Sequence, residues 1–169
     1  MVTLKRRPTR LVALFAWAAL LLTACGGRGE VQVTPTEPAG VARQQCTRLV
    51  AHAPSSVDGQ QRRSITPHDA LAGAWGDPPI VLRCGVQRPA ALRPTSQCFA
   101  INGVGWLVTQ DGKEVDPARP VTGTLVFTTI GRAAYVQVTV PDNYQPATDV
   151  LVDLTNVIKA STKTVRRCA

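Results

Sequence analysis

The chain has 169 residues, five of them cysteines, and a formal net charge of +8, which is about enough sequence for a single domain. Its cations are scattered and no basic run is interleaved with aromatic residues, so the sequence does not favour a nucleic-acid-binding protein. Residues 1–24 carry four cations and no acid, so the remainder has a net charge of +4. We expect that charge to lie next to anionic lipid or an anionic wall polymer.

The N-terminal segment 1–24 has the layout of a lipoprotein signal peptide. Four basic residues precede the apolar run Leu11–Ala24, which is shorter than the roughly 20 residues that a membrane span needs. Leu22, Thr23 and Ala24 then place small residues before Cys25, as a lipoprotein signal peptidase requires. We expect a diacylglyceryl anchor on Cys25 and a location on the extracytoplasmic face of the cell membrane. The alternative is an ordinary cleaved signal followed by an incidental cysteine.

Two segments follow the signal peptide in this interpretation. Residues 25–44 are rich in Gly, Thr and Pro and short of apolar side chains, which predicts a flexible tether. Residues 45–169 are expected to form one domain. A helix is predicted at its start, over Val41–Ala53, because apolar residues recur there at helical spacing and Pro54 ends the pattern.

The middle of the chain is predicted to be mostly strands. Thr66 and Pro67 resemble a helix start, so a short helical turn is expected to run through Ala70–Trp75. Four β-rich runs come after the turn sequence Gly76–Pro79, and these are Ile80–Cys84, Cys98–Val108, Gly123–Gly131 and Ala133–Pro141. Asn102-Gly103 marks a turn or bulge within the second run, and Gly131-Arg132 indicates a hairpin between the last two.

A second helix is predicted over Pro146–Ser161. Val150, Leu154, Val157 and Ile158 form its apolar stripe, and its charges match the helix dipole. Helices at both ends with strands between them favour an α+β fold. We expect a small antiparallel sheet of about four strands, with the N-terminal and C-terminal helices packed on it.

The four cysteines after Cys25 are an even number, which suits an oxidising compartment and two disulfides. Three connectivities are possible. We expect Cys84–Cys98, because these residues flank a short loop, and Cys46–Cys168, because that bridge would join the two ends of the domain. The alternative use of cysteine is a zinc site. Because no Cys-x-x-Cys occurs and only two histidines could join, we expect no metal and no cofactor.

The candidate ligand-binding residues are two indoles, two guanidinium groups and one carboxylate: Trp75, Trp106, Arg83, Arg132 and Asp77. These groups could line a groove for an anionic or sugar-like ligand. The structural interpretation is preferred, since Pro, Gly, Trp and Cys together are mostly scaffold residues. It places both indoles in the core, Asp77 at the Pro-Pro turn, Arg83 on a backbone carbonyl or Asp77, and Arg132 in solvent.

No catalytic residue is predicted. The chain has no Gly-x-Ser-x-Gly and no Ser-x-x-Lys. His52 at a helix end and His68 in a turn are typical of surface or capping residues. The acidic cluster within "QDGKEVD" indicates an exposed loop.

Four segments carry a resemblance to a known family. They are "WGDPPIVLRCGV", "PTSQCFAINGVGWLV", "FTTIGR" and the terminal "VRRC". With them the chain resembles an actinobacterial lipoprotein family known as domain of unknown function 3515, over Cys46 to Cys168. The resemblance implies an exported, lipid-anchored envelope protein. It implies no activity and transfers no catalytic residue.

The sequence therefore predicts a monomeric domain, attached to the membrane through Cys25, that binds a partner protein, a wall polymer or another envelope component without catalysis. One alternative is an enzyme acting on envelope glycans or peptides, with Asp77 or His68 as acid or base. Another is a carrier of a small ligand or lipid, which would need a closed apolar cavity.

Overall fold

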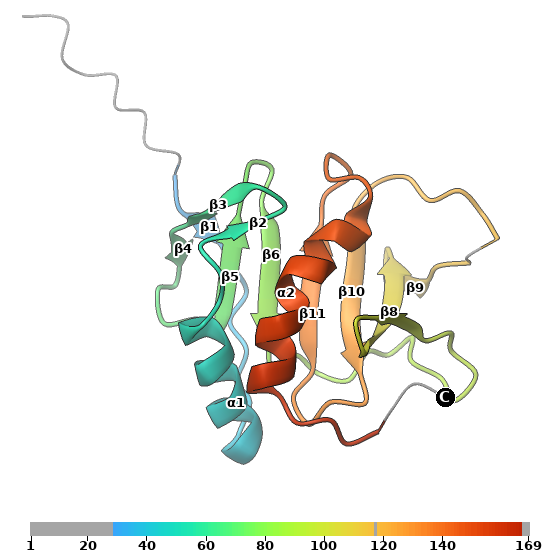
Figure 1. Ribbon diagram of the computed structural model, residues 1–169, viewed down its shortest axis with the longest axis horizontal. Coiled ribbons are helices and arrows are strands. Elements are labelled where there is room, and N and C mark those ends of the chain that lie inside the picture. Colours follow the sequence, from blue (N-terminus) through green and yellow to red (C-terminus); the bar gives the residue numbers. More distant parts are fainter. Residues whose placement is uncertain (1–28, 117, 167–169) are drawn as a thin grey trace, which may run out of the picture.

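The computed structural model describes residues 29–116 and 118–166, and its fold is α+β, as the sequence predicts. Helices α1 (Gly40–Ala51) and α2 (Ala147–Ser161) contact each other on one face of a nine-stranded antiparallel sheet (Figure 1). The predicted signal peptide, Cys25 and Cys168 lie outside the described residues. Neither of the two helices is long and apolar enough to cross a membrane.

The sheet has the spatial order β2–β3–β5–β6–β11–β10–β8–β7, and β9 pairs with β8. Its strands are β2 (Ser56–Val57), β3 (Gln60–Arg63), β5 (Ala72–Trp75), β6 (Ile80–Cys84), β7 (Phe99–Ile101), β8 (Val104–Gln110), β9 (Lys113–Glu114), β10 (Leu125–Ile130) and β11 (Val136–Val140). A separate parallel pair joins β1 (Val31–Gln32) to β4 (Ile65–Thr66).

The sheet is larger than the predicted one of about four strands. The four predicted β-rich runs form one continuous block of it, β6–β11–β10–β8–β7, and Asn102-Gly103 is the turn between β7 and β8. The additional strands have few branched or aromatic residues, since β3 reads "QQRR" and β5 reads "AGAW". Intrinsic β-propensity is therefore low in both, and pairing with neighbouring strands decides their conformation.

Strand β5 replaces the helical turn predicted through Ala70–Trp75. Ala72 and Ala74 face one side of the sheet and Trp75 faces the other, and all three are buried. Alanine favours a helix where packing does not decide, but here both sides of the segment are covered. The prediction was wrong because it used local propensity at a position that tertiary contacts control.

The main core lies between the sheet and the two helices. Alternate residues of the central strands face the helices, among them Leu82 in β6 and Val138 in β11. The predicted apolar stripe of α2 meets them, with Val150, Leu154 and Ile158 fully buried. A smaller core lies on the opposite face, where β1 and β4 cover β5 and β6 with Val31, Val33, Ala70, Ala72 and Ala74.

The disulfide within the described residues joins Cys46 to Cys84, with 5.3 Å between the Cα atoms, so neither predicted pairing is correct. Cys46 lies on the buried face of α1 and Cys84 faces the helices at the end of β6. Cys98 precedes β7, which is four strand positions from β6, or about 19 Å at 4.8 Å per strand. A disulfide needs Cα atoms within about 7 Å, so closeness in sequence misled the prediction. Cys98 does not carry a free thiol.

Residues 30–39 also differ from the predicted tether over 25–44. Val31 and Val33 are buried against the sheet, and the Thr36 hydroxyl donates a hydrogen bond to the carbonyl of Cys84. The prediction relied on the polar, Pro-rich composition of this segment and gave no weight to its two alternating valines, which are enough to pair it with β4. The chain therefore lies on the domain from Glu30 onward.

Candidate functional site

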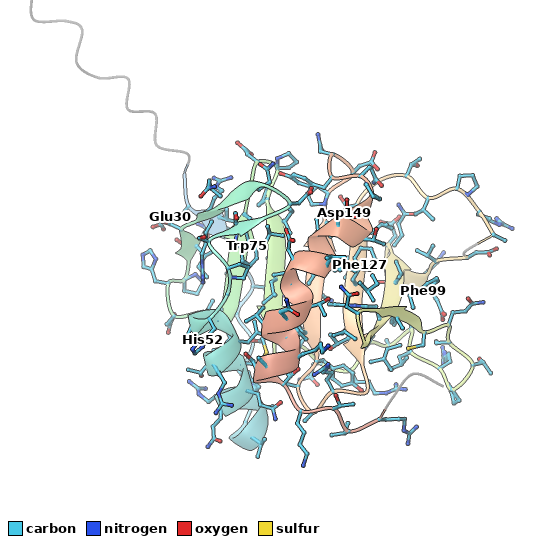
Figure 2. All side chains as sticks on the ribbon, in the orientation of Figure 1. Glu30, His52, Trp75, Phe99, Phe127 and Asp149 are labelled. Carbon is cyan, nitrogen blue, oxygen red and sulfur yellow. A yellow bond between two sulfur atoms is a disulfide. The ribbon has the colours of Figure 1, made fainter. Side chains whose placement is uncertain are left out.

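The five candidate ligand-binding residues do not converge on one site. Trp75 in β5 and Trp106 in β8 both face the helices and are fully buried. Four strand positions separate them, or about 19 Å. In Figure 2, Trp75 and Phe127, which contacts Trp106, lie well apart along the sheet. The two indoles therefore cannot hold one small ligand between them.

Each indole has its own set of core contacts. Trp75 donates from Nε1 to the carbonyl oxygen of Pro54 at 2.9 Å, and the Arg62 guanidinium lies 5.9 Å from the centre of its ring. Trp106 packs edge to face with Phe127, with 6.4 Å between ring centres. Its Nε1 has no hydrogen-bond acceptor among the described residues. Both residues occupy the positions that the structural interpretation gave them.

Asp77 and Arg83 lie apart from each other. Asp77 follows β5 in the turn, with one carboxylate oxygen 3.7 Å from Nη1 of Arg63. Arg83 lies on the face of the sheet opposite to the helices, where its Nη2 donates to Oε1 of Gln137 in β11. The partner of Arg83 is therefore a cross-strand neighbour rather than the expected backbone carbonyl or Asp77.

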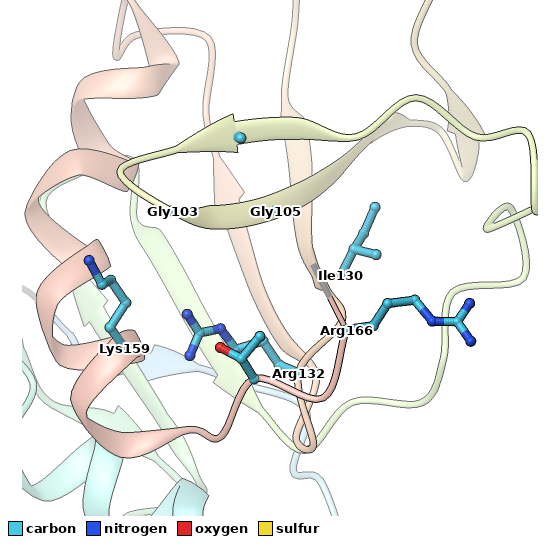
Figure 3. A pocket seen from close by; sticks show the side chains of 8 residues that line it. Gly103, Gly105, Ile130, Arg132, Lys159 and Arg166 are labelled. Carbon is cyan, nitrogen blue, oxygen red and sulfur yellow. The ribbon is translucent and has the colours of Figure 1, made fainter. Parts of the chain in front are cut away.

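Arg132 lines a pocket and is buried, whereas the structural interpretation expected it in solvent. This pocket has a volume of about 460 Å³ and lies beside the β7–β8 hairpin and the ends of β10 and α2 (Figure 3). We call it the cationic pocket, and its lining consists of Ala100, Gly103, Gly105, Ile130, Arg132, Lys159, Thr164 and Arg166. Its volume is within the usual range for small-ligand sites.

Three strands and a tight turn build one side of the cationic pocket. Ala100, Gly105 and Ile130 lie opposite one another on β7, β8 and β10. The turn that joins β7 to β8 has positive φ at both Asn102 and Gly103, as a two-residue hairpin turn requires. Nζ of Lys159 donates to the Asn102 carbonyl at 3.2 Å, so the last turn of α2 is fastened to this hairpin.

The segment after α2 forms the other side. Thr164 pairs with Arg132 as an antiparallel bridge, and the amides of Val165 and Arg166 both donate to the carbonyl of Gly131. Gly131 has a φ of +70°, and a Cβ at this position would lie 2.0 Å from the carbonyl oxygen of Arg166. Only glycine therefore allows this C-terminal strap, residues 162–166, to lie so close.

Hydrogen bonds hold the Arg132 guanidinium in place, but they involve only some of its donors. Nη1 donates to the carbonyl and to the hydroxyl of Thr162, at 2.7 and 3.2 Å, where α2 ends. The residue is 6% exposed, and its burial lowers the pKa of the guanidinium from its ordinary value. Arginine nevertheless stays charged in proteins. Nη2 and Nε have no acceptor among the described residues, which leaves three N–H donors for a ligand.

The described lining of the pocket holds three cations and no acid. Arg132, Lys159 and Arg166 come from three different segments, and Figure 3 shows Arg132 between the other two. The ion pairs of the described residues involve none of the three. Cations that lack a carboxylate partner attract an anion, and arginine binds carboxylate and phosphate oxygens through two parallel hydrogen bonds.

The described lining of the pocket consists of three cations, a threonine, three small residues and one large apolar residue. The described lining includes no histidine, cysteine or carboxylate, which are side chains that often act as general acids or bases. The described residues contain no group of three or more potential metal ligands. The cations of the described lining could hold an oxyanion in the pocket.

The histidines and the acidic loop lie elsewhere. His52 ends α1 with Nδ1 2.9 Å from the Arg48 carbonyl, and His68 lies 3.6 Å from the Glu30 carboxylate. Glu114 accepts hydrogen bonds from Ser96 and from the amide of Gln97, so it ties a loop to β9.

Sequence reasoning found one of the three cations of the pocket. Lys159 was interpreted as a complement to the helix dipole, and Arg166 was noted only as part of "VRRC". The available signal was the run of four cations at 159–167 without an acid. This run could be assigned to a site only once the structure showed that the C-terminal strap lies beside the β7–β8 hairpin.

Comparison with known proteins gives one match. A family model described as "Protein of unknown function (DUF3515)" matches residues 8–166, which is most of the chain. No curated protein and no solved structure matches it.

Proposed function

The chain belongs to the family described as "Protein of unknown function (DUF3515)", and because that description assigns no activity, we propose a function from the residues themselves. We propose that the protein is exported, is anchored to the cell membrane by lipid on Cys25, and acts by binding. Its ligand in this proposal is an acidic group of an anionic wall polymer, held in the cationic pocket.

The observation that carries the proposal is the state of Arg132. A buried guanidinium is costly unless it is hydrogen-bonded, and among the described residues only one of its three nitrogens has an acceptor. A ligand carboxylate or phosphate would take up the remaining donors and offset the charge of Lys159 and Arg166. The unused donors support a site whose normal occupant is an anion.

A polymer is favoured over a protein partner by the lining of the pocket. Protein interfaces depend on buried aromatic or large apolar anchors, and Ile130 is the only large apolar residue among the described lining residues. The remaining lining consists of cations, a threonine and very small residues. Such a surface suits the charged and hydroxylated groups of a wall polymer.

The two alternative functions have less support. An acid–base enzyme would need a desolvated carboxylate near a histidine, but the side chains of His68 and Asp77 are 75% and 58% exposed. A carrier of a small apolar ligand would need an apolar cavity, whereas the cationic pocket presents three charged side chains.

Calorimetric titration of the detergent-solubilised, full-length protein tests the proposal. The probes are glucuronate as a carboxylate, glycerol 3-phosphate as a phosphate, and glucose as the neutral control. We expect one or both acidic probes to bind at low salt and glucose not to bind. The double variant Lys159→Met/Arg166→Met is expected to lose about tenfold in affinity, or 1.4 kcal/mol. Binding should weaken as salt screens the charges.

The matched control is Lys113→Met, which removes one exposed cation from β9. Lys113 pairs with Gln110, at the end of β8 that lies away from Gly105 and the pocket. Its affinity for the acidic probes is expected to stay within twofold of the wild type. Equal binding of glucose, or an equal loss in the control, would contradict a specific anion site. Arg132→Lys is a further variant, since it keeps the charge but removes the two-pronged geometry.

A further inference from the structure

The structure leaves fewer residues between the predicted lipid anchor and the folded domain than the sequence predicts. We call residues 29–38 the clasped arm, because hydrogen bonds between Gly29 and Thr36 hold it on the domain. The amide of Val31 donates to the carbonyl of Ser64 at 2.9 Å, and the amide of Val33 donates to that of Thr66 at 3.0 Å. Both valines are more than nine-tenths buried.

Side chains fasten the start of the arm. Nη2 of Arg63 donates to the Gly29 carbonyl at 2.6 Å, while Nη1 donates to the Gly76 carbonyl at 3.0 Å. Glu30 accepts a hydrogen bond from the Thr66 hydroxyl and lies 3.6 Å from His68. Arg63 therefore joins the first described residue of the arm to the turn that follows β5.

Covalent geometry then limits the distance from anchor to domain. Cys25 and Gly29 are four residues apart, and an extended chain spans at most about 3.6 Å per residue, so their Cα atoms lie within about 14 Å. A flexible tether of 20 residues would have an average reach of about 25 Å and could extend to about 70 Å. Because the arm is held on the domain, the distance available between the predicted anchor and the domain is much shorter than a flexible tether over 25–44 would allow.

We propose that the clasped arm holds the domain against the lipid surface, with the β1–β4 edge nearest the headgroups and the cationic pocket on the edge that faces the envelope. This inference rests on the lipid anchor of the proposed function. Its interaction surface is the edge formed by β1, β4 and the neighbouring turn, and its partner is the bilayer to which the chain is attached.

The sheet order supports this orientation. The arm covers β5 and β6, whereas the cationic pocket lies on β10, β8 and β7. From β5 to β8 there are four strand positions, or about 19 Å. Figure 1 shows β1 and β4 at one side of the sheet and β8 at the other. A pocket at the far side stays open to a polymer outside the membrane, which a long tether would not ensure.

Energy transfer in vesicles tests the proposal. The lipidated full-length protein is placed in vesicles of phosphatidylglycerol and phosphatidylethanolamine with an acceptor dye on the headgroups. A donor dye is attached through a reactive residue introduced at Asp69 beside the arm, or at Val165 beside the pocket, both of which are exposed. We expect transfer from Asp69 to be at least twice as efficient as transfer from Val165.

Two changes then release the domain from the surface. A 16-residue Gly-Ser insertion between Arg28 and Gly29 lengthens the linker, and Val31→Ser/Val33→Ser frees the arm. Both are expected to reduce transfer from Asp69 by half or more. The control is the same insertion after Gly112, a loop position that is open to solvent, and it should leave transfer from Asp69 unchanged. The linker insertion keeps the test valid if the valine variant unfolds.

The outcomes separate this inference from the proposed function. Equal transfer from both positions, or no effect of the linker insertion, would overturn the clasped orientation even if the anchor is real. Mass spectrometry of the same preparation reports the lipid on Cys25. If that lipid is absent, the anchor of the proposed function fails and the orientation fails with it.

Discussion

Gly131 decides whether the C-terminal strap can close the cationic pocket. Its φ of +70° and the Arg166 carbonyl that lies against it leave no room for a side chain. At Gly112 the φ is +75°, yet nothing lies within 4 Å of an added Cβ. The two glycines therefore share the cost of a left-handed conformation, about 1–2 kcal/mol for alanine, but only Gly131 adds a steric clash.

We expect Gly131→Ala to lower the free energy of unfolding by more than Gly112→Ala, with a further loss of about 1–3 kcal/mol from overpacking. Urea denaturation of both variants measures the difference. Because the strap carries Arg166, the Gly131 variant should also bind the acidic probes more weakly. Equal stability of the two variants would mean that the strap does not lie against Gly131.

Tyr144 predicts a pH dependence of stability. Its hydroxyl donates to the Pro78 carbonyl at 2.6 Å, and burial raises the pKa of this hydroxyl above its ordinary value of 10.0. Below pH 10 the phenol is neutral in both states, so its contribution is complete. As the pH rises beyond 10, the unfolded chain loses the proton first, and the free energy of unfolding falls.

The comparison is with Tyr144→Phe, which cannot ionise. The stability difference between the wild type and this variant should be constant up to about pH 9.5 and should shrink from pH 10 upward. Urea titrations between pH 7 and 11 measure it. A difference that stays constant or grows over the alkaline range would show that the hydroxyl is not buried.

At the scale of elements, the second disulfide depends on the strap. Ala100 and Arg166 line the same pocket, Cys98 is two residues before Ala100, and Cys168 is two residues after Arg166. Two residues span at most about 7 Å, so the chain length after Arg166 allows a bridge to Cys98, whose thiol is not free. We predict a Cys98–Cys168 disulfide beside Cys46–Cys84.

Peptide mapping of the non-reduced protein measures both pairings. Linked peptides that contain Cys46 with Cys84 and Cys98 with Cys168 are expected. A peptide that joins Cys84 to Cys98 would contradict the sheet order, because β6 and β7 are four positions apart. Loss of the Cys46–Cys84 bridge in a double serine variant should cost about 4 kcal/mol for a 38-residue separation.

The elements that the sequence predicted correctly are those whose apolar pattern is also their burial pattern. Strand β11 alternates buried valines with half-buried polar residues, and the stripe of α2 packs on the sheet. The β5 segment and the arm could not be predicted in the same way. Their conformations depend on contacts between the two valines of the arm and the alanines of β5, and each segment has too few branched or aromatic residues to show a strand pattern by itself.

At the scale of the whole molecule, the fold class was predictable and the cationic pocket was not. The pocket combines residues 100–105, 130–132 and 159–166, which come together only when the strap pairs with the β10–β11 loop. The sequence singled out Arg132 for its hairpin and not for its neighbours. Tryptophans and prolines attracted attention because they are rare, but their roles here are in the core and the turns.

The central claim is that this protein binds an anionic wall polymer through the cationic pocket. The most direct measurement is co-sedimentation of the full-length protein with isolated cell walls, for the wild type, Lys159→Met/Arg166→Met and Lys113→Met. We predict that the wild type and the Lys113 variant sediment with the walls at low salt, and that the pocket variant stays in solution. Equal sedimentation of all three proteins would contradict the claim.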